Sequence, residues 1–401
     1  MRAVMYGAGN IGRGFIGQLF AASGYEVTFI DVAEPVIDAI NRDGKYPVRL
    51  LSSSGHEDVW VEGIKAVNGK DEEKAAQAIA DADIMATAVG VRVLPFIAPV
   101  IAKGIRNRFA KTTAPLNIII CENLIDANKV LEKLIKEKLT DEEIKLFDER
   151  IGLVEASIGR MVPIQTQEMQ TGNPLQVCTE YYGFLPVDKD AFKGEIPEIK
   201  NMKPFNHFDF YIQRKLFIHN MGHAICAYLG MLKTDTYIYE TVKRGDILFI
   251  AENAMMESAL ALSTKFKIPI EDIYFHIRDL LSRFSNKALG DTCARVGGDT
   301  VRKLGPNDRL IGAINCCNTM GISPGFISVG AGAALYCHLK EKNLPQTRDA
   351  AGSALAEVST LVKGSGEAAL ILGMYELIAK GAEFSELIKA AAEAGNRKGI
   401  I

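Results

Sequence analysis

The stretch "MYGAGNIGRGF", residues 5–15, places three glycines in the spacing GxGxxG, directly after an apolar run and before a helical pattern. In this context the first glycine permits a tight turn, the second lets the backbone approach a pyrophosphate, and the third lets a helix pack closely on a strand. Amides at the start of such a helix bind phosphate oxygens. The stretch therefore predicts a dinucleotide-binding turn, with a ligand-free glycine-rich turn as the alternative. The expected contacts are Gly7, Ala8, Gly9, Asn10, Ile11 and Gly12.

Two later features support a dinucleotide. Asp31 ends the next strand pattern, "EVTFID", nineteen residues after Gly12. A carboxylate there accepts hydrogen bonds from ribose hydroxyls and repels a 2′-phosphate, so we expect NAD rather than NADP. The segment "TAVG" ends a later strand, where such sheets contact their cofactor. Unless it is a simple turn, it predicts contacts from Thr87, Ala88, Val89 and Gly90. FAD uses the same fold, but no other feature of the sequence favours it.

Short apolar runs alternate with helical patterns through about residue 130. Four of these runs have the pattern of strands: "RAVMYGAG", "EVTFIDV", "ADIMATAVG" and "LNIIICEN". Strands that alternate with helices predict an α/β fold, here a Rossmann-type doubly wound parallel sheet. Two further runs, "RIGLVEASIGRMVP" and "PLQVCTEYYGFLPV", are expected to extend or edge that sheet.

From about residue 205, long helical patterns dominate, and they end in a pair of alanine-rich helices after Gln346. The segment "FKGEIPEIKNMKPFN" carries two prolines and little periodicity, which is typical of a domain junction. We therefore predict two domains. Residues 1–200 would form an NAD-binding Rossmann domain with extra strands, and residues 201–401 a mostly α-helical domain with the substrate and catalytic residues.

Composition excludes several classes of partner. The 401 residues carry a formal net charge of -3, which argues against nucleic acid and anionic membranes as partners. No run approaches the roughly 18 apolar residues of a transmembrane helix. The seven cysteines are scattered without a CxxC pair, which argues against a disulfide framework or a zinc cage. We expect a reduced, cytoplasmic, metal-free protein with a small-molecule substrate, in an oligomeric state that the sequence does not indicate.

The nine residues "KLFIHNMGH", 215–223, combine a lysine, an asparagine and a histidine. At about 100° per residue, Asn220 and His223 lie about 140° and 80° from Lys215, on one broad helical face. With a nicotinamide cofactor, a desolvated lysine could take a hydroxyl proton, and an asparagine amide could donate to the developing carbonyl oxygen. The alternative is a solvated face with a structural histidine. Zinc bound by His223 and Cys226 is less favoured, because clustered ligands are missing.

Several motifs together resemble the polyol-specific long-chain dehydrogenases, the mannitol dehydrogenase family. They are "GAGNIGRGFIG" near the N-terminus, "CEN" at 121–123, "KLFIHNMGHA" at 215–224 and "RVGGDTVRKLGPNDRLI" at 295–311. The resemblance covers most of the chain and is strongest to members that act on a hexitol phosphate. It implies a metal-independent, NAD-dependent oxidoreductase that interconverts a polyol or its phosphate with a ketose. It also implies Lys215 as general base, Asn220 and Asn123 as donors to the substrate oxygen, and His223 as the substrate-orienting residue.

The chain departs from the family pattern at three glycines. Family members usually have an acidic residue at Gly159, and the hexitol phosphate enzymes commonly have a second arginine at Gly298 and a lysine near Gly312. These departures leave the hydride-transfer residues intact but concern the expected substrate pocket. The alternatives are therefore the same mechanism on another ketose, such as a hexuronate, or a dinucleotide-binding paralogue without turnover.

Basic residues are candidates for recognising an anionic group of the substrate. A phosphate or carboxylate would be bound by an arginine fork or a lysine. The candidates are Arg160, Arg295, Arg302 and Lys303, with Arg309 in the same basic run. The alternative is surface charge that pairs with Asp299 and Asp308.

Overall fold

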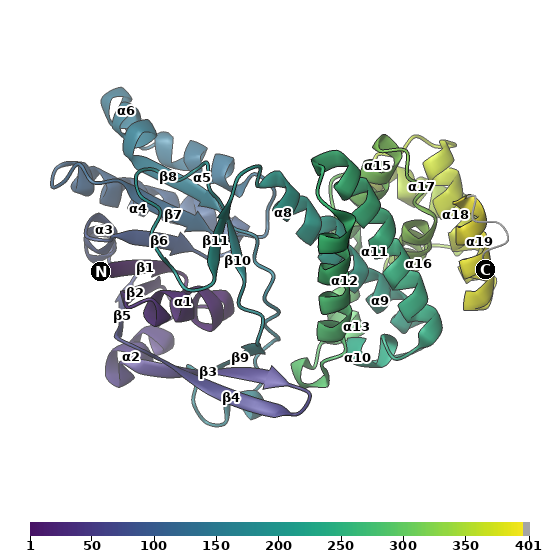
Figure 1. Ribbon diagram of the computed structural model, residues 1–401, viewed down its shortest axis with the longest axis horizontal. Helices are drawn as coiled ribbons and strands as arrows, with labels where there is room; N and C mark the ends of the chain where they lie inside the picture. The colour runs from purple at the N-terminus through teal and green to yellow at the C-terminus, as the bar shows by residue number, and fades with distance from the viewer. Residues whose placement is uncertain (396–401) are drawn as a thin grey trace. The chain divides into compact units, whose positions relative to one another are not determined.

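The computed structural model describes residues 1–395 and divides the chain into two compact units, Met1–Asp209 and Phe210–Ile401. The two units differ in the kind of secondary structure they contain, as Figure 1 shows. The first unit is α/β and the second is helical in its described part. No helix of the described residues is both long enough and apolar enough to span a bilayer.

A six-stranded parallel sheet forms the centre of the first unit. Its strand order is β5-β2-β1-β6-β7-β8, and every neighbouring pair is parallel. The order reverses direction at β1, so that β2 lies on one side of it and β6 on the other, as in doubly wound folds. The predicted fold class is therefore confirmed. The strands are β1 (Arg2–Tyr6), β2 (Glu26–Asp31), β5 (Ile64–Asn68), β6 (Ile84–Thr87), β7 (Leu116–Ile120) and β8 (Ile151–Glu155).

Helices cover both faces of this sheet because each strand is apolar on both sides. One face packs against a π-helical segment (Gly12–Ile16), α1 (Gly17–Ala22) and α2 (Glu34–Asp43). The opposite face packs against α3 (Glu72–Ala80), α4 (Leu94–Phe109), α5 (Ala127–Lys136) and α6 (Asp141–Arg150). A short α7 (Gln167–Gln170) precedes the last strands of the unit.

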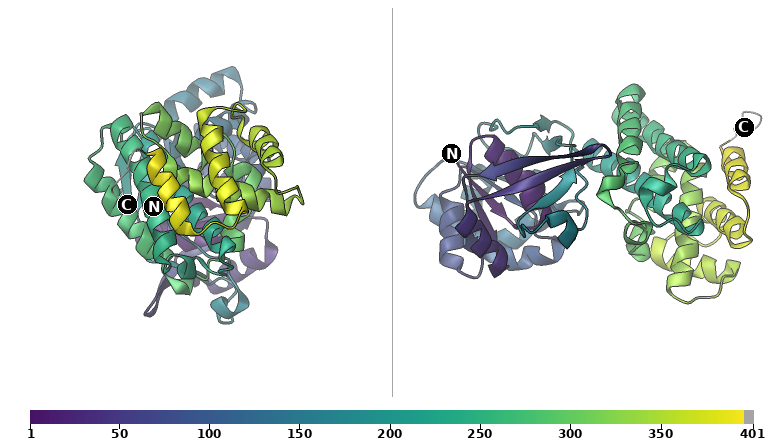
Figure 2. Two further views of the ribbon diagram at one scale, coloured as in Figure 1. Left: turned by 90° about the vertical axis from the view of Figure 1, so that its right-hand side faces the viewer. Right: turned by 90° about the horizontal axis from the view of Figure 1, so that it is seen from below.

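Two small sheets hold the remaining strands. The antiparallel hairpin of β3 (Lys45–Ser52) and β4 (Gly55–Glu62), conspicuous in the right-hand view of Figure 2, pairs through β3 with β9 (Val177–Glu180). The strand β10 (Leu185–Asp188) pairs with β11 (Met202–Phe205). The prediction that both late apolar runs extend the main sheet is right for β8 and wrong for β9 and β10. The hairpin, which the sequence analysis did not predict, supplies the edge that β9 joins.

The second unit consists of helices along its described length. The stretch with the predicted site residues Lys215, Asn220 and His223 spans α8 (Asp209–Arg214), a π-helical segment (Lys215–Asn220) and α9 (Met221–Leu232). The other helices are α10 (Ile238–Thr241), α11 (Gly245–Phe266), α12 (Ile270–Phe284), α13 (Cys293–Gly297), α14 (Thr300–Lys303), α15 (Ile311–Thr319), α16 (Gly325–Glu341), α17 (Arg348–Ser359), α18 (Gly366–Ala379) and α19 (Phe384–Ala394). Three helices therefore follow Gln346, where two were expected.

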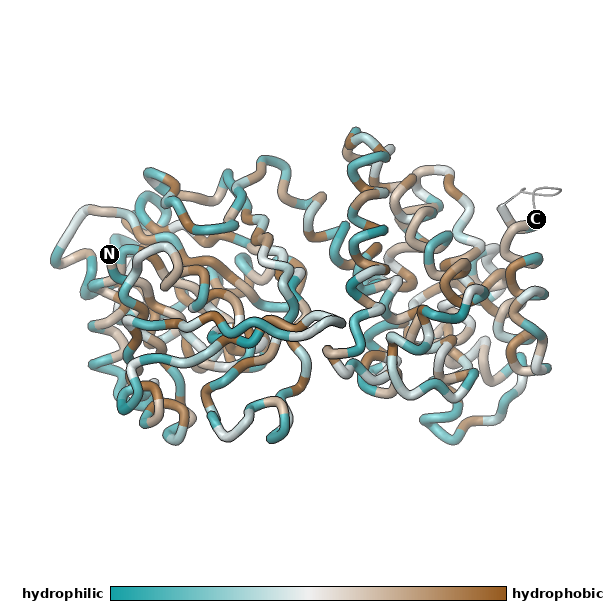
Figure 3. The backbone as a smooth tube through the Cα atoms, turned by 60° about the horizontal axis from the view of Figure 1, so that its bottom comes forward, coloured by the Kyte–Doolittle hydropathy of each residue, from teal (hydrophilic) through white to brown (hydrophobic). Residues whose placement is uncertain are grey.

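The core of the second unit forms around α16. This helix is buried on nearly all sides and packs against α9, α11, α18 and α19. A helix that is apolar all round is expected at such a central position. The outer helices instead alternate apolar and polar residues, visible in Figure 3 as brown and teal along the same coils. In α12, for example, Ile273, Ile277 and Leu280 are buried and the intervening charged side chains are exposed.

Candidate active site

The phosphate-binding turn has the geometry that its glycines predict. Gly7 has φ +102°, and a Cβ there would lie 2.5 Å from the carbonyl oxygen of Ala88. A Cβ on Gly12 would lie 1.9 Å from the carbonyl oxygen of Gly7, so the strand and the helix approach too closely for any side chain. Gly9 is exposed, and nothing lies within 4 Å of its Cβ position. The turn is thus closed toward the protein and open toward solvent, which fits a dinucleotide pyrophosphate.

The backbone of Ala8 is hydrogen-bonded through both its N–H and its carbonyl oxygen. Its N–H donates to Oδ2 of Asp31 at 2.6 Å, and its carbonyl oxygen accepts from Nη1 of Arg13. The other carboxylate oxygen of Asp31 accepts the N–H groups of Val32 (2.7 Å) and Ala33 (3.0 Å). An ionised carboxylate offers about four acceptor positions. These three bonds therefore leave Asp31 capacity for one ribose hydroxyl.

Arg13, which directly follows the turn, was not predicted from the sequence. Its side chain is buried, and its Nε donates to the carbonyl oxygen of Leu175 at 3.2 Å. Burial lowers the pKa of this guanidinium, which nevertheless remains charged at neutral pH. Arg13 thus fastens the turn to a segment more than 160 residues later in the chain. Sequence alone gives no signal for such a distant carbonyl partner.

The predicted loop Thr87–Gly90 lies directly beside the phosphate turn. Ala88 donates to the carbonyl oxygen of Tyr6 at 2.9 Å, and Val89 Cγ1 would lie 3.2 Å from a Cβ on Gly7. The structure also brings Glu122 to this loop, where its carboxylate accepts backbone N–H groups. Glu122 was not predicted, although the motif "CEN" contains it, because its partners lie more than 30 residues earlier in the chain. Asn123 itself is exposed after β7.

Arg160 is buried and bound within the first unit. Its Nε donates to the carbonyl oxygen of Tyr182 at 2.5 Å, and its Nη1 donates to Gly14 O (2.9 Å) and Gln18 Oε1 (2.5 Å). The guanidinium also lies 4.7 Å from the centre of the Phe15 ring. These contacts tie Arg160 to the helix that follows the phosphate turn. A substrate role for this residue stays a prediction.

The lysine motif does not form a regular α-helix. Residues Lys215–Asn220 are π-helical, and α9 begins at Met221. Hydrogen bonds in a π-helix span one residue more than in an α-helix, and such segments are frequent at functional sites. Lys215 and Asn220 are five residues apart. The angle between them around the helix axis is therefore smaller than the roughly 140° expected for an α-helix. Lys215, Asn220 and His223 are all half-buried.

His223 is positioned by two neighbours from later in the chain. Its Nε2 lies 3.3 Å from Oδ2 of Asp291, and its ring stacks on Phe284 with 4.7 Å between centroids and 13° between planes. His219, one turn earlier, is buried, and burial holds its pKa well below the ordinary range, so that it is neutral. Asp291 is a further candidate for the site, and it was not predicted from the sequence. It lies 68 positions after His223, and nothing near it in the sequence marks it.

The basic run is largely paired within the second unit. Arg295 forms an ion pair with Asp291, the same carboxylate that contacts His223. Arg302 binds Asp299 at 2.6 Å through Nε and Asp308 at 3.2 Å through Nη1. This agrees with the alternative of paired charge for Arg302. Arg295, in contrast, is connected through Asp291 to the lysine motif.

Lys303 is a buried cation without a carboxylate partner at ion-pair distance among the described residues. Its Nζ donates to the carbonyl oxygen of Gly298. Burial, with the nearby charges of Arg309 and Arg302, lowers its pKa to about 8. Cys226, the thiol considered for zinc, is completely buried, and burial raises its pKa to about 12. This thiol is therefore protonated at neutral pH.

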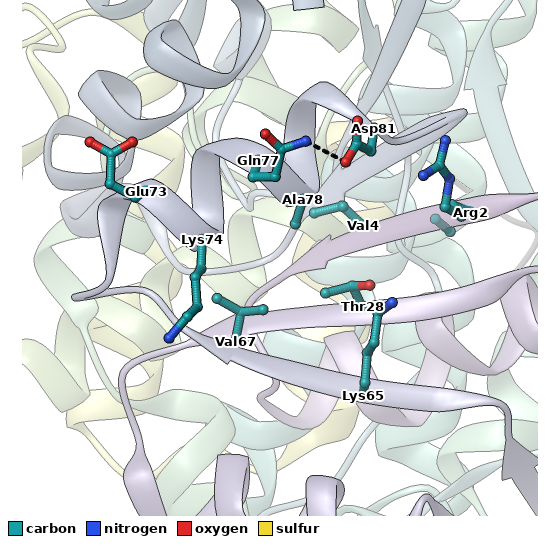
Figure 4. Close-up of a pocket in the computed structure, with 11 residues that line it drawn as sticks. Arg2, Val4, Thr28, Lys65, Val67, Glu73, Lys74, Gln77, Ala78 and Asp81 are labelled. Atoms are coloured by element: carbon teal, nitrogen blue, oxygen red, sulfur yellow. Dashed lines mark hydrogen bonds between the residues drawn. The ribbon is translucent and has the colours of Figure 1, made fainter. Parts of the chain in front are cut away.

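A groove with a volume of about 540 Å³ lies elsewhere on the first unit. Figure 4 shows residues that line it. Its floor is formed by Val4, Thr28 and Val67 of three neighbouring strands, and one wall by Lys74 and Gln77 of α3. None of the predicted site residues lines it. Ligands of doubly wound sheets bind at the carboxyl ends of the strands, where the glycine turn lies, and this groove extends instead toward the start of β1.

Comparison with known proteins gives matches over nearly the whole chain. Residues 1–201 match the mannitol dehydrogenase Rossmann domain, and residues 207–395 match the mannitol dehydrogenase C-terminal domain. The mannitol-1-phosphate 5-dehydrogenase of Geobacillus thermodenitrificans is 36% identical over 373 residues, which are 92% of this chain and 93% of that protein. The protein of the same name from Brevibacillus brevis is 37% identical, over 84% of this chain and 86% of its own.

A solved structure shows the same fold. The mannitol 2-dehydrogenase of Pseudomonas fluorescens, solved as a ternary complex with NAD and D-mannitol, superposes with a TM-score of 0.77. The superposition covers 98% of this chain and 94% of that one, at 14% sequence identity. A D-sorbitol dehydrogenase in substrate-free form is similar to the same degree.

Proposed function

The chain belongs to the mannitol dehydrogenase family, NAD-dependent oxidoreductases that act on CH–OH groups, and we propose that it interconverts mannitol 1-phosphate and fructose 6-phosphate. One observation carries the choice of substrate. Two relatives with 36% and 37% identity, aligned over more than four fifths of both chains, are named mannitol-1-phosphate 5-dehydrogenases. The proposal rests on this likeness and on the side chains described above.

The first unit would hold the cofactor. The amides of the turn from Gly7 to Gly12 bind the pyrophosphate, and the remaining acceptor position of Asp31 binds a ribose hydroxyl. The same carboxylate disfavours NADP, because a 2′-phosphate would bring like charges together. NAD, when bound, would supply the hydride acceptor for oxidation of the alcohol carbon, and NADH would supply the hydride donor for the reverse reaction.

The second unit would supply the proton transfer. We assign Lys215 as the general base: its neutral Nζ takes the proton of the substrate hydroxyl during oxidation and returns it during reduction. The side-chain amides of Asn220 and Asn123 donate to the substrate oxygen as it becomes a carbonyl. His223 orients the substrate, and the carboxylate of Asp291 lies 3.3 Å from its Nε2.

The basic residues remain our candidates for the phosphate of the substrate. An arginine carries five N–H donors, and Arg295 uses its Nη2 on Asp291, so most of its donors can still bind an oxyanion. Arg302 is more fully engaged by its two aspartates. Among this group, Arg295 is therefore our first choice, with Arg302, Lys303 and Arg160 after it.

Parallel assays of NADH oxidation with fructose 6-phosphate, fructose, tagaturonate and fructuronate test the proposed substrate. We expect fructose 6-phosphate to give the highest kcat/KM, by about a hundredfold or more over fructose, because the phosphate adds charge-assisted hydrogen bonds. Turnover of a hexuronate without turnover of fructose 6-phosphate would contradict the proposed substrate but agree with the proposed mechanism. If the protein binds NADH but turns over none of the four ketoses, a dinucleotide-binding paralogue without turnover would be favoured.

A further inference from the structure

Glu122 holds two consecutive amides of the loop that follows β6. Its Oε1 accepts the N–H of Val89 at 3.0 Å and its Oε2 accepts the N–H of Gly90 at 2.8 Å. The side chain is only 8% exposed. Hydrogen bonds to an ionised, buried carboxylate are roughly twice as strong as neutral ones. The carboxylate therefore fixes both peptide groups of the loop in one orientation.

The loop needs such an anchor because its backbone is irregular. Gly90 has φ +89° and ψ 142°, a conformation that belongs to no helix or strand. The loop also touches the phosphate turn, since Ala88 O occupies the place that a Cβ on Gly7 would need. A shift of the loop would consequently displace the turn. Glu122 is thus linked to the cofactor site through packing as well as hydrogen bonds.

We propose that Glu122 is the positioning residue of the cofactor site, pre-organising the loop Ala88–Gly90 against the phosphate turn. The inference rests on the proposed function in one respect, the identity of the cofactor. Because Asn123 follows directly in the chain, the same anchor sets the start of the segment that carries this proposed oxygen donor. Glu122 itself takes no part in proton or hydride transfer.

The second unit offers a matched control for a structural role. Glu257 is 1% exposed and also holds two consecutive amides, Phe326 N and Ile327 N, each at 3.0 Å. These amides begin α16, in the core of the other unit. Glu257→Gln therefore removes the same kind of interaction at a place remote in sequence from the cofactor turn. It reports how far loss of stability alone changes cofactor binding.

The experiment measures NADH binding to the full chain by titration calorimetry, with melting temperature as a second readout. Glu122→Gln keeps the size of the side chain but replaces one acceptor oxygen with an NH₂ group, so one loop amide loses its partner. We expect the Kd for NADH to rise about tenfold, since the loop must then be ordered on binding. Glu122→Asp keeps the charge and both oxygens, and we expect it to stay within about threefold of the unaltered chain.

Steady-state kinetics with fructose 6-phosphate add a second discriminating readout. For Glu122→Gln we expect KM for NADH to rise about tenfold, while kcat at saturating NADH changes less than about threefold. Glu257→Gln should melt at a lower temperature yet bind NADH with unchanged Kd.

Three results would overturn the inference. They are a folded Glu122→Gln variant with unaltered NADH affinity, an equal loss of affinity in Glu257→Gln, and a loss in Glu122→Asp as large as in Glu122→Gln. Absence of NADH binding by the unaltered chain would instead refute the proposed function, and the inference with it.

Discussion

Lys215 is the residue on which the proposed proton transfer depends. Replacing it with alanine removes the base but none of the groups of the phosphate turn. We expect Lys215→Ala to lower kcat about a thousandfold, within the range of general base catalysis, and to leave the Kd for NADH nearly unchanged. Stopped-flow reduction of fructose 6-phosphate and NADH titration measure the two quantities. Lys389→Ala, an exposed lysine of α19, is the control, and near-normal turnover in Lys215→Ala would remove the assigned role.

The sequence identified site residues whose role is local and missed those whose partners are distant. Gly7 and Gly12 were predicted because the turn itself demands glycine, and the structure shows the close approaches that require them. Glu122 and Asp291 were not predicted. Each acts on a residue more than 30 positions away, and only the folded chain brings the partners together.

The strand β5, at one edge of the main sheet, is covered by a side chain of α2. Asn41 of α2 donates through Nδ2 to the carbonyl oxygen of Ala66 in β5 at 3.0 Å, and its Oδ1 accepts the N–H of Ala66 at 2.8 Å. The side-chain amide thus replaces a neighbouring strand at the centre of the edge strand. Unpaired edges invite association with other chains, so this contact protects as well as stabilises.

Asn41→Ala should therefore destabilise the chain by about 1–2 kcal/mol, because it leaves two backbone groups of Ala66 without their partner. Urea unfolding measures the loss, and light scattering measures association through the uncovered edge. Asp38→Ala, an exposed substitution on the same helix, gives the same type of change in helix propensity without touching β5. Equal stability of the two variants would mean that the edge contact contributes nothing.

Helices and strands with a clear pattern of apolar residues were predicted from the sequence. The polar hairpin and the π-helical segment, which lack a distinctive pattern of apolar residues, were not. The strands β1, β2, β6, β7 and β8 carry apolar runs long enough to be recognised. The hairpin β3–β4 was overlooked because β4 is mostly polar and exposed. The π-helical segment Lys215–Asn220 has an ordinary helical sequence, and only its hydrogen bonds distinguish it from an α-helix.

Because the chain folds into two compact units, we expect it to unfold in more than one step. A ligand that binds one folded unit raises the melting temperature of that unit by mass action. Saturating NADH should consequently identify the calorimetric transition of residues 1–209. This assignment lets the pH dependence of the first unit be measured within the intact chain.

Glu155, at the end of β8, should make that transition sensitive to pH. Burial, reinforced by Asp126, Asp188 and Asp209 and opposed by Lys129, raises its pKa to about 7. The folded state then binds a proton that the unfolded state releases above about pH 4.5, so stability falls as pH rises from about 4.5 to 7.

After allowance for partial exposure, we expect this loss to be about 2 kcal/mol at pH 8. Glu155→Gln cannot ionise, so it should raise the NADH-sensitive melting temperature at pH 8 and change it much less at pH 5. Glu142→Gln, an exposed carboxylate of α6, should shift neither value. A melting difference between Glu155→Gln and the unaltered chain that is the same at both pH values would contradict the raised pKa.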